Sequence, residues 1–558
     1  GGIDAGTPVA RDRLDVRFDM ARDVNGRGDV NVPGDSVVFA AHPVIPGTSI
    51  ADLRMKWALR LNPTFEGAFR APPARAADRN VVTGGVVNGA EVWTGEVLAD
   101  SARSPDGVAR AGSFFVDLPD VDFLYPGDVL HYHLAATDSD GRVTTLPTDV
   151  SGFGEWDANG RSAYDRTWTM RALPTITDAS GTQPPVLVHD DSGREGSAGF
   201  FVPALAQLGL VEGVHYDTFT TQAAQWGLSN GLASAGAVTP LGDRRGHGAT
   251  VEQLAGYSAI LYFAGERSSR LLSDGSNDRE DDKSPDLQLL TAWKDLPGAR
   301  GIAHFGDAVA SAVAGDSPQV GAAYVAGSMG VRLIGPDVGP RIGGQTAPMV
   351  QAVDPTAEAF VVLGGCPEPH TFDHVEAAPG ATRSHGFVDP ATGAPFAAIA
   401  AGVSHVRTVD GGRKIDLTFP FALPTIVDVA PKAVPGIGVR TRFLGTVLDA
   451  LGAPSGPADP VAVPVRREPS LTIGPNPFNP STTVVLVLPR AGVETRVEVF
   501  DVRGQQVRVL FDGTASAVEL RLQWDGRDDR GNRVASGVYL TRATTEGFTG
   551  TRKAILVK

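Results

Sequence analysis

Gly474-Pro-Asn-Pro-Phe-Asn-Pro480 opens a series of five motifs that decides how the end of this chain folds. The others follow in the order Val497-Glu-Val-Phe-Asp-Val-Arg-Gly504, Trp524-Asp-Gly-Arg-Asp-Asp-Arg-Gly531, Ala535-Ser-Gly-Val-Tyr539 and Arg552-Lys-Ala-Ile-Leu-Val-Lys558. Apolar residues alternate with polar ones between them, and Asp-Gly pairs interrupt the alternation. A period of two is typical of a strand with one buried face, and Asp-Gly favours tight turns. The alternation therefore predicts a small β-sandwich over residues 470–558, with strands at 484–488, 497–499, 506–511, 520–524, 538–542 and 554–557.

The order of these motifs resembles the type IX secretion C-terminal sorting domain and the related Ig-like domain of flagellar hook-cap proteins. The resemblance implies a protein that is secreted or held on the cell surface of a Gram-negative-type bacterium, with the outer-membrane secretion machinery as its partner. It implies these sorting-motif residues: Asn476, Pro477, Phe478, Asn479, Pro480, Trp524, Asp525, Gly526, Gly537, Tyr539 and Lys553. The alternative for each residue is a role in a turn or in the core of the sandwich.

Composition narrows the class of protein. A chain of 558 residues should hold about three or four domains. Its net charge of −15 disfavours binding to nucleic acid, which depends on clustered Lys and Arg. No apolar run is long enough to cross a membrane, and one cysteine excludes an intrachain disulfide. Because the chain begins Gly1-Gly2 without Met, we expect a fragment or a processed product whose upstream domains are missing.

Residues 1–172 predict a β-rich region that resembles an Ig- or fibronectin-like sandwich. Strands are expected at 36–40, 55–61 and 129–135, and little helical periodicity is present. Tyr125-Pro-Gly-Asp128 leads into the last of these strands, and Pro followed by Gly sets a type II turn.

The pattern changes at residue 184, where short buried strands begin to alternate with helices. Strands are expected at 184–189, 216–219, 257–265, 300–306, 360–363 and 397–400, and helices at 199–210, 287–293 and 441–451. This alternation predicts a parallel α/β domain over 184–451. A Pro-rich linker over 452–469 then separates it from the C-terminal module. The whole chain is expected to be a multidomain α+β protein.

The middle region resembles the glutamine amidotransferase-like α/β fold, with flavodoxin-like topology. The residues that carry the resemblance are Asp190-Asp191, the strand at 257–265, and Gly364-Gly-Cys-Pro367 with Thr371-Phe-Asp373. Members of that family place a catalytic Cys at the elbow after a strand. Here the strand at 301–306 is followed by Asp307, so the resemblance implies a degenerate, non-catalytic domain.

Cys366 is the alternative nucleophile, with His370 or His374 as its base. A structural cysteine in a Gly-Gly-Cys-Pro turn is the competing interpretation, because no third orienting group is identifiable. His370 and His374 would share one face of a helix, and His131 and His133 share one face of a strand. Either pair has the spacing of two metal ligands, and each is also consistent with ordinary surface or core histidines.

Acidic residues mark two further candidates. Asp190, Asp191, Gly265 and Glu266 lie where parallel strands end, which is where open sheets bind ligands such as calcium or a sugar. The alternative role is helix capping. A second group is a run of aspartates, in which calcium competes with a solvated loop: Asp274, Asp278, Asp281, Asp282 and Asp286. No other cofactor is expected.

Two functions from different classes remain. The first is an exported or cell-surface protein whose tail serves sorting or anchoring and whose α/β domain is a non-catalytic ligand-binding or structural module, contacting a surface glycan or a protein. The second is the C-terminal fragment of a secreted hydrolase, a peptidase or glycan-active enzyme, with catalysis upstream or in the α/β cleft. The missing nucleophile at Asp307 favours the first.

Overall fold

The structure is a computed structural model. It describes residues 2–4, 36–43, 45–65, 81–103, 109–117, 126–157, 160–177, 182–192, 197–220, 237–238, 244–245, 249, 251–269, 271–276, 285–344, 347–354, 357–362, 371–389, 391–427, 437–455, 470–474, 478–488, 492–501, 503–515, 519–545 and 548–557. The chain divides into two compact units, and all but two short segments of the second unit lie in residues 462–558. None of the described helices is long and apolar enough to cross a membrane.

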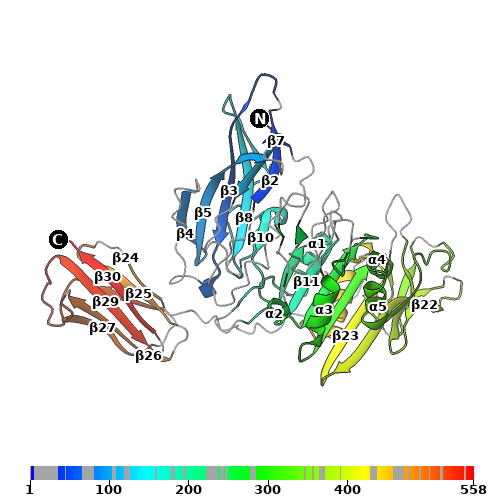
Figure 1. Ribbon diagram of the computed structural model, residues 1–558. Coiled ribbons are helices and arrows are strands. Elements are labelled where there is room, and N and C mark those ends of the chain that lie inside the picture. The colour runs from blue at the N-terminus through cyan, green and yellow to red at the C-terminus, as the bar shows by residue number, and fades with distance from the viewer. Residues whose placement is uncertain are drawn as a thin grey trace. The chain divides into compact units, whose positions relative to one another are not determined.

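The N-terminal region contains two antiparallel sheets (Figure 1). The smaller has the order β1 (Gly2–Asp4), β2 (Ser36–His42), β7 (Ala109–Asp117), β6 (Asp100–Arg103). The larger has the order β10 (Thr169–Arg171), β8 (Val129–Asp138), β3 (Ile50–Arg60), β5 (Ala90–Leu98), β4 (Val81–Val87), and β9 (Val143–Leu146) also pairs with β8. Trp57 and Trp93 are fully buried at the centre of the core. Pro126 and Gly127, whose φ is +90°, form the expected turn before β8.

A sheet of eleven strands forms the middle region. Five strands pair in parallel in the order β12 (Tyr216–Thr220), β11 (Val186–Asp190), β15 (Ala259–Gly265), β16 (Arg300–Gly306), β23 (Gly412–Phe419). Every residue of β11, β15 and β16 is buried, because helices cover both faces of the sheet. These helices are α1 (Ala198–Gln207), α2 (Val251–Leu254), α3 (Asp286–Asp295), α4 (Val309–Asp316), α5 (Val320–Gly327) and α6 (Val439–Leu451).

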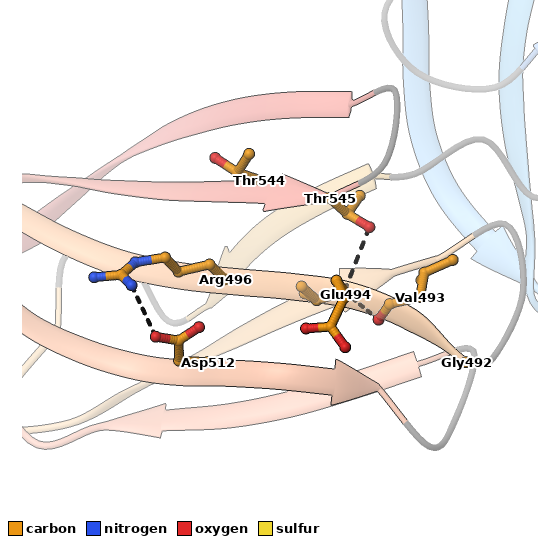
Figure 2. Close-up of a pocket in the computed structure, with 8 residues that line it drawn as sticks. Gly492, Val493, Glu494, Arg496, Asp512, Thr544 and Thr545 are labelled. Atoms are coloured by element: carbon orange, nitrogen blue, oxygen red, sulfur yellow. Dashed lines mark hydrogen bonds and ion pairs between the residues drawn. The ribbon is translucent and has the colours of Figure 1, made fainter.

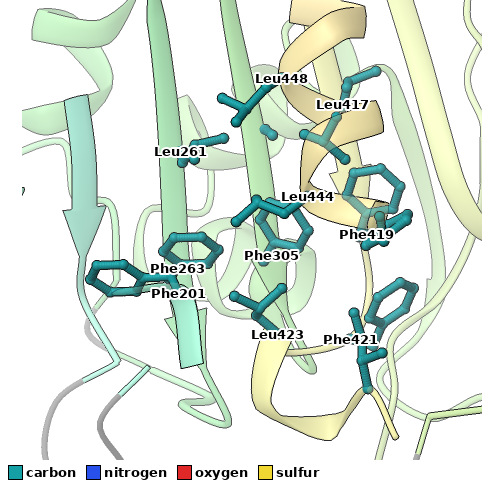
Figure 3. Close-up of a cluster of buried hydrophobic side chains, with 14 of the residues drawn as sticks. Phe201, Leu261, Phe263, Phe305, Leu417, Phe419, Phe421, Leu423, Leu444 and Leu448 are labelled. Atoms are coloured by element: carbon teal, nitrogen blue, oxygen red, sulfur yellow. The ribbon is translucent and has the colours of Figure 1, made fainter. Parts of the chain in front are cut away.

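Each face of the parallel strands has its own apolar core. On one face, Phe263, Phe305 and Phe419 pack beneath Leu444 and Leu448 of α6 (Figure 3). On the other face, α3, α4 and α5 cover the sheet, and Trp293 of α3 is fully buried. Gly452 ends α6 with a φ of +73°, a left-handed conformation that favours glycine.

The sheet is not parallel throughout, and this corrects the expectation for residues 184–451. The strands between α5 and β23 all pair in antiparallel fashion: β17 (Val331–Gly335), β18 (Met349–Ala352), β19 (Phe360–Val361), β20 (His374–Ala377), β21 (Thr382–Val388) and β22 (Pro395–Val409). β22 continues through a tight turn into β23, with Asp410 and Gly411 at positive φ. A short hairpin leaves no room for a crossover helix, so the pairing there must be antiparallel.

Residues 470–558 form two antiparallel sheets, as the alternation predicts. One has the order β24 (Ser470–Gly474), β25 (Thr482–Val487), β28 (Glu519–Trp524). The other has the order β27 (Gln506–Ala515), β26 (Val493–Asp501), β29 (Gly537–Thr545), β30 (Phe548–Leu556). The strand at 470–474 is the one that the sequence reading missed. Val484, Leu486, Val497 and Ala543 are among the residues fully buried in the core of the module.

Candidate functional site

The aromatic residues of the C-terminal motifs meet in one buried cluster. The ring of Phe478 lies 5.3 Å from that of Trp524, and Trp524 lies 5.0 Å from Tyr539. Trp524 is fully buried, and its indole N–H donates to the carbonyl of Arg527 at 3.0 Å. The hydroxyl of Tyr539 donates to the carbonyl of Ala535 at 2.7 Å. Both polar groups of the cluster therefore have partners, as buried polar groups require.

The Pro-Phe-Asn-Pro segment also protects an edge of the sheet. The Phe478 N–H donates to the Ile555 carbonyl at 2.9 Å, and the Val557 N–H donates to the Phe478 carbonyl at 3.0 Å. Phe478 thus forms a bridge along β30. Gly526 has a φ of +69°, and a Cβ there would lie 3.1 Å from the carbonyl oxygen of Pro480. A glycine in this turn allows the segment to lie close to it.

The other motif residues divide by exposure. Asn479, Pro480, Asp525, Gly537 and Lys553 are exposed. The carboxylate of Asp525 accepts the N–H of Arg527 at 3.2 Å and so stabilises the turn after Trp524. Asn476 and Pro477 lie outside the described residues. The aromatic motif residues are thus core residues, and the exposed ones are the part of the motif that a partner can contact.

An open groove of about 510 Å³ lies on the same module (Figure 2). Its lining residues come from β26, β27, β29 and the turn before β26: Gly492, Val493, Glu494, Thr495, Arg496, Asp512, Thr544 and Thr545. Arg496 forms ion pairs with Asp512 at 2.8 Å and with Glu498 at 3.0 Å. The groove offers hydroxyls and paired charges, which suit polar contacts. Its lining contains neither a histidine nor a cysteine.

Asp190 and Asp191, predicted to line a ligand cleft, are buried at the end of β11 and bond within the protein. The Ser192 hydroxyl donates to Asp190 at 2.5 Å. Asp191 accepts from the Tyr262 hydroxyl at 2.8 Å and from the Arg267 guanidinium at 2.6 Å. Burial raises the pKa of Asp190, and burial raises the pKa of Asp191 to about 6 although Arg267 opposes that shift.

The other two residues predicted for this cleft differ in exposure. Gly265 is buried with a φ of +63°, and a Cβ there would lie 2.8 Å from the Cβ of Ser192. Glu266 is exposed. The strand ends therefore bring the four residues to one edge of the sheet, as expected. Ligand binding by them remains a prediction.

Asp307 lies at the elbow after β16, where the amidotransferase resemblance would require a cysteine. It is buried, and its carboxylate accepts the Ala422 N–H at 2.6 Å. Its neighbour Asp373, which donates its N–H to the Asp307 carbonyl at 2.8 Å, caps α4 by accepting the N–H groups of Ala310 and Ser311. Burial, with the nearby Asp307 charge, raises the pKa of Asp373 to about 6. The Asp373 carboxylate thus holds the start of helix α4, and the Asp307 carboxylate holds the backbone at Ala422.

A buried ion network was missed by the sequence reading. Lys294 of α3 pairs with Asp416 of β23, and Asp416 also accepts from Arg407 of β22 at 2.8 Å. His304 lies beside it, 3.3 Å from the hydroxyl of Tyr324. Burial lowers the pKa of His304 to about 4, so the ring is neutral. No sequence motif signals this network, because its members are far apart in the chain.

The histidine pair at 131 and 133 lies in an aromatic core. His131 stacks on Trp156 with 4.2 Å between the rings, and its Nδ1 accepts the Gly154 N–H at 3.1 Å. Burial lowers the pKa of His131 to about 3 and that of His133 to about 4. His374 begins strand β20, so it is not on a helix with His370. Within the described ranges, no group of three potential metal ligands occurs.

Several predicted residues cannot be placed. Cys366, His370, Asp278, Asp281 and Asp282 lie outside the described residues. Two members of the same aspartate run are described. Asp274 accepts the hydroxyl of Ser276 at 2.6 Å, and Asp286 is buried at the start of α3. Calcium binding by this loop remains a prediction.

A match to a protein family concerns the C-terminal module. Residues 478–547 match the FlgD Ig-like domain. No curated protein matches the chain. Among solved structures, FlgD of Xanthomonas campestris is 29% identical over 16% of this chain and 62% of its own, with a TM-score of 0.12. The amidotransferase-like assignment of the middle region receives no support from these similarities.

Two surface-secretion proteins of Porphyromonas gingivalis are also similar. PorZ, an essential bacterial surface component of the type-IX secretion system, is 26% identical over 16% of this chain and 12% of its own, with a TM-score of 0.13. Latent PorU is 15% identical over 41% of this chain and 17% of its own, with a TM-score of 0.15. The chain thus spans only a small part of either protein.

Proposed function

We propose that this chain belongs to an exported or cell-surface protein in which residues 470–558 serve sorting or anchoring. The match of residues 478–547 to the FlgD Ig-like domain carries the proposal. The buried cluster of Phe478, Trp524 and Tyr539 supports the proposal, because it packs residues from three of the motifs against one another. The partner is the outer-membrane secretion machinery, and the route is type IX secretion, the system to which PorZ belongs.

Within this proposal, the middle region is a non-catalytic ligand-binding or structural module. An acyl-transfer site needs an activated nucleophile at the elbow, and Asp307 occupies that position. The carboxylate of Asp307 binds the Ala422 N–H, and Asp191 binds Tyr262 and Arg267. These bonds favour a structural role for the acids over catalysis.

The exposed motif residues are the ones through which the machinery would recognise the module. Asn479 and Lys553 are exposed, whereas Phe478 and Trp524 are buried. Recognition needs accessible groups, so substitution of the exposed residues should impair export without unfolding the module. Substitution of the buried residues should impair export through loss of the fold.

The test is a fusion of residues 470–558 to a periplasmic reporter enzyme in a bacterium that has type IX secretion. We expect the reporter at the cell surface or in the medium. Export should fall at least about tenfold in a Lys553→Ala, Asn479→Ala variant, a loss of recognition on the order of 1.4 kcal/mol. A matched control is Thr551→Ala, on the same strand and also exposed. A reporter that stays in the periplasm would reject the sorting role.

A further inference from the structure

Strand β4 is an edge of the larger N-terminal sheet. It pairs with β5 on one side, and no described strand pairs with its other side. Its sequence is Val-Val-Thr-Gly-Gly-Val-Val, without a charged residue or a proline. Val86 is 74% exposed. Natural proteins usually protect edge strands with charges, prolines or a covering segment, because unpaired N–H and C=O groups bind other strands.

Three other edges of the described sheets have such protection. β27 contains Arg508 and Asp512, and β28 contains Glu519 and Arg521. The edge of β30 is bridged by Phe478. The uncharged edge at β4 differs from these three edges.

The hairpin turn determines which groups of β4 point outward. Asn88 and Gly89 both have positive φ, which makes a two-residue turn between β4 and β5. In such a hairpin the residues that flank the turn, Val87 and Ala90, exchange hydrogen bonds, and every second pair does the same. The N–H and C=O groups of Val82, Gly84 and Val86 then face away from β5. One hydrogen bond of β5 supports this register. The Glu91 carbonyl points away from β4, because it accepts the N–H of Leu61 at 2.9 Å on the other side of β5.

The outward N–H and C=O groups of β4 can form hydrogen bonds with the same groups of β4 in a second copy of the chain. When two β4 strands run antiparallel about a two-fold axis at Gly84, each Gly84 faces the other, and Val82 faces Val86 of the second copy. All three residues then exchange main-chain hydrogen bonds across the axis. No like charges meet across the axis, because β4 contains no charged residue. The sequence reads nearly the same in both directions, which is what an isologous interface requires.

We propose that β4 is a dimerisation edge, at which two copies of this chain join their larger N-terminal sheets into one continuous antiparallel sheet. The pairing closes after two copies, because each strand uses up the edge of the other. A short strand pair has a small interface, so the dimer should dissociate on dilution.

Sedimentation velocity of the full chain over a range of concentrations tests the proposal. We expect a shift from monomer to dimer as concentration rises. Val86→Lys adds the kind of charge that protects natural edges, and it should leave only monomer. Val143→Lys is the matched control, because Val143 is also an exposed valine, in β9 of the same sheet. It should dimerise like the parent chain.

Two further variants separate pairing from misfolding and test the register. Val86→Pro removes only an outward N–H, so it should keep the parent far-UV circular dichroism and lose the dimer. Gly84→Cys, in a Cys366→Ser background, should form a cross-linked dimer on mild oxidation. Facing Cα atoms in such a pair lie about 5.5 Å apart, within reach of a disulfide. A parent chain that stays monomeric at all concentrations, or that assembles beyond the dimer, would overturn the proposal.

Discussion

The C-terminal module and the middle region differ in what their motif residues do. In the module, Phe478, Trp524 and Tyr539 come from three separate motifs and pack in one buried cluster. In the middle region, Asp191 and Asp307 lie at strand ends, where an α/β fold often binds ligands, yet their carboxylates bond to groups within the protein. An ordered series of sequence motifs can therefore consist of core residues. Acidic residues at strand ends can likewise serve to stabilise the fold and not to bind a ligand.

The two regions differ for two physical reasons: the module is small, and the strand ends of the middle region are polar. A module of fewer than a hundred residues has few buried positions, so each large aromatic residue carries much of its stability. In the larger sheet, the carboxylates of Asp191 and Asp307 at strand ends are buried, and burial of a carboxylate requires hydrogen-bond donors. Tyr262 and Arg267 supply those donors to Asp191.

The largest effect should come from the aromatic cluster. Trp524→Ala removes a fully buried side chain and should lower the free energy of unfolding of the module by about 3–5 kcal/mol. Hydrogen–deuterium exchange of the full chain measures this as lost protection in β25 to β30. Val538→Ala, at a partly exposed position of β29, is the control and should change it by less than about 0.5 kcal/mol. Equal effects of the two substitutions would mean that the cluster is not the core of the module.

A smaller effect is expected at the strand ends. Asp191→Ala leaves Arg267 and Tyr262 without this acceptor, and breaking such a buried pair should cost about 3 kcal/mol. Exchange protection of β11 and β15 measures the loss. Glu266→Ala, at an exposed neighbour, should change protection by less than about 0.5 kcal/mol. If Asp191→Ala left protection unchanged, the carboxylate would be free for a ligand and the structural interpretation would be wrong.

The pH dependence of stability tests whether the carboxylate of Asp373 is buried or solvated. Its pKa in the folded chain is raised from 3.8 to about 6, so its contribution to stability is full below pH 3.8 and is lost as the pH rises through 6. The amide of Asp373→Asn does not titrate and still accepts the N–H groups that cap α4. Between pH 3.8 and 7, the parent chain should therefore lose about 3 kcal/mol of stability relative to Asp373→Asn. Unfolding curves in urea measure this difference, and parallel pH profiles would contradict it.

The sequence was sufficient for the parts of the fold that follow from local periodicity. Alternation identified most strands of the module, and the helix expected at 441–451 lies within α6. The antiparallel half of the middle sheet was missed, because β22 is rich in alanine and resembles a short isolated strand. The partners of Asp191 and the Lys294–Asp416 pair could not be predicted, since they depend on contacts between residues far apart in the chain.

The central claim is that the five motifs specify a β module that folds by itself. Residues 470–558 can be expressed alone, and their far-UV circular dichroism recorded during heating. We predict a strand-type spectrum that is lost in one cooperative transition, because the buried clusters around Val497 and Trp524 lie wholly within the segment. A coil spectrum without a transition would contradict the claim.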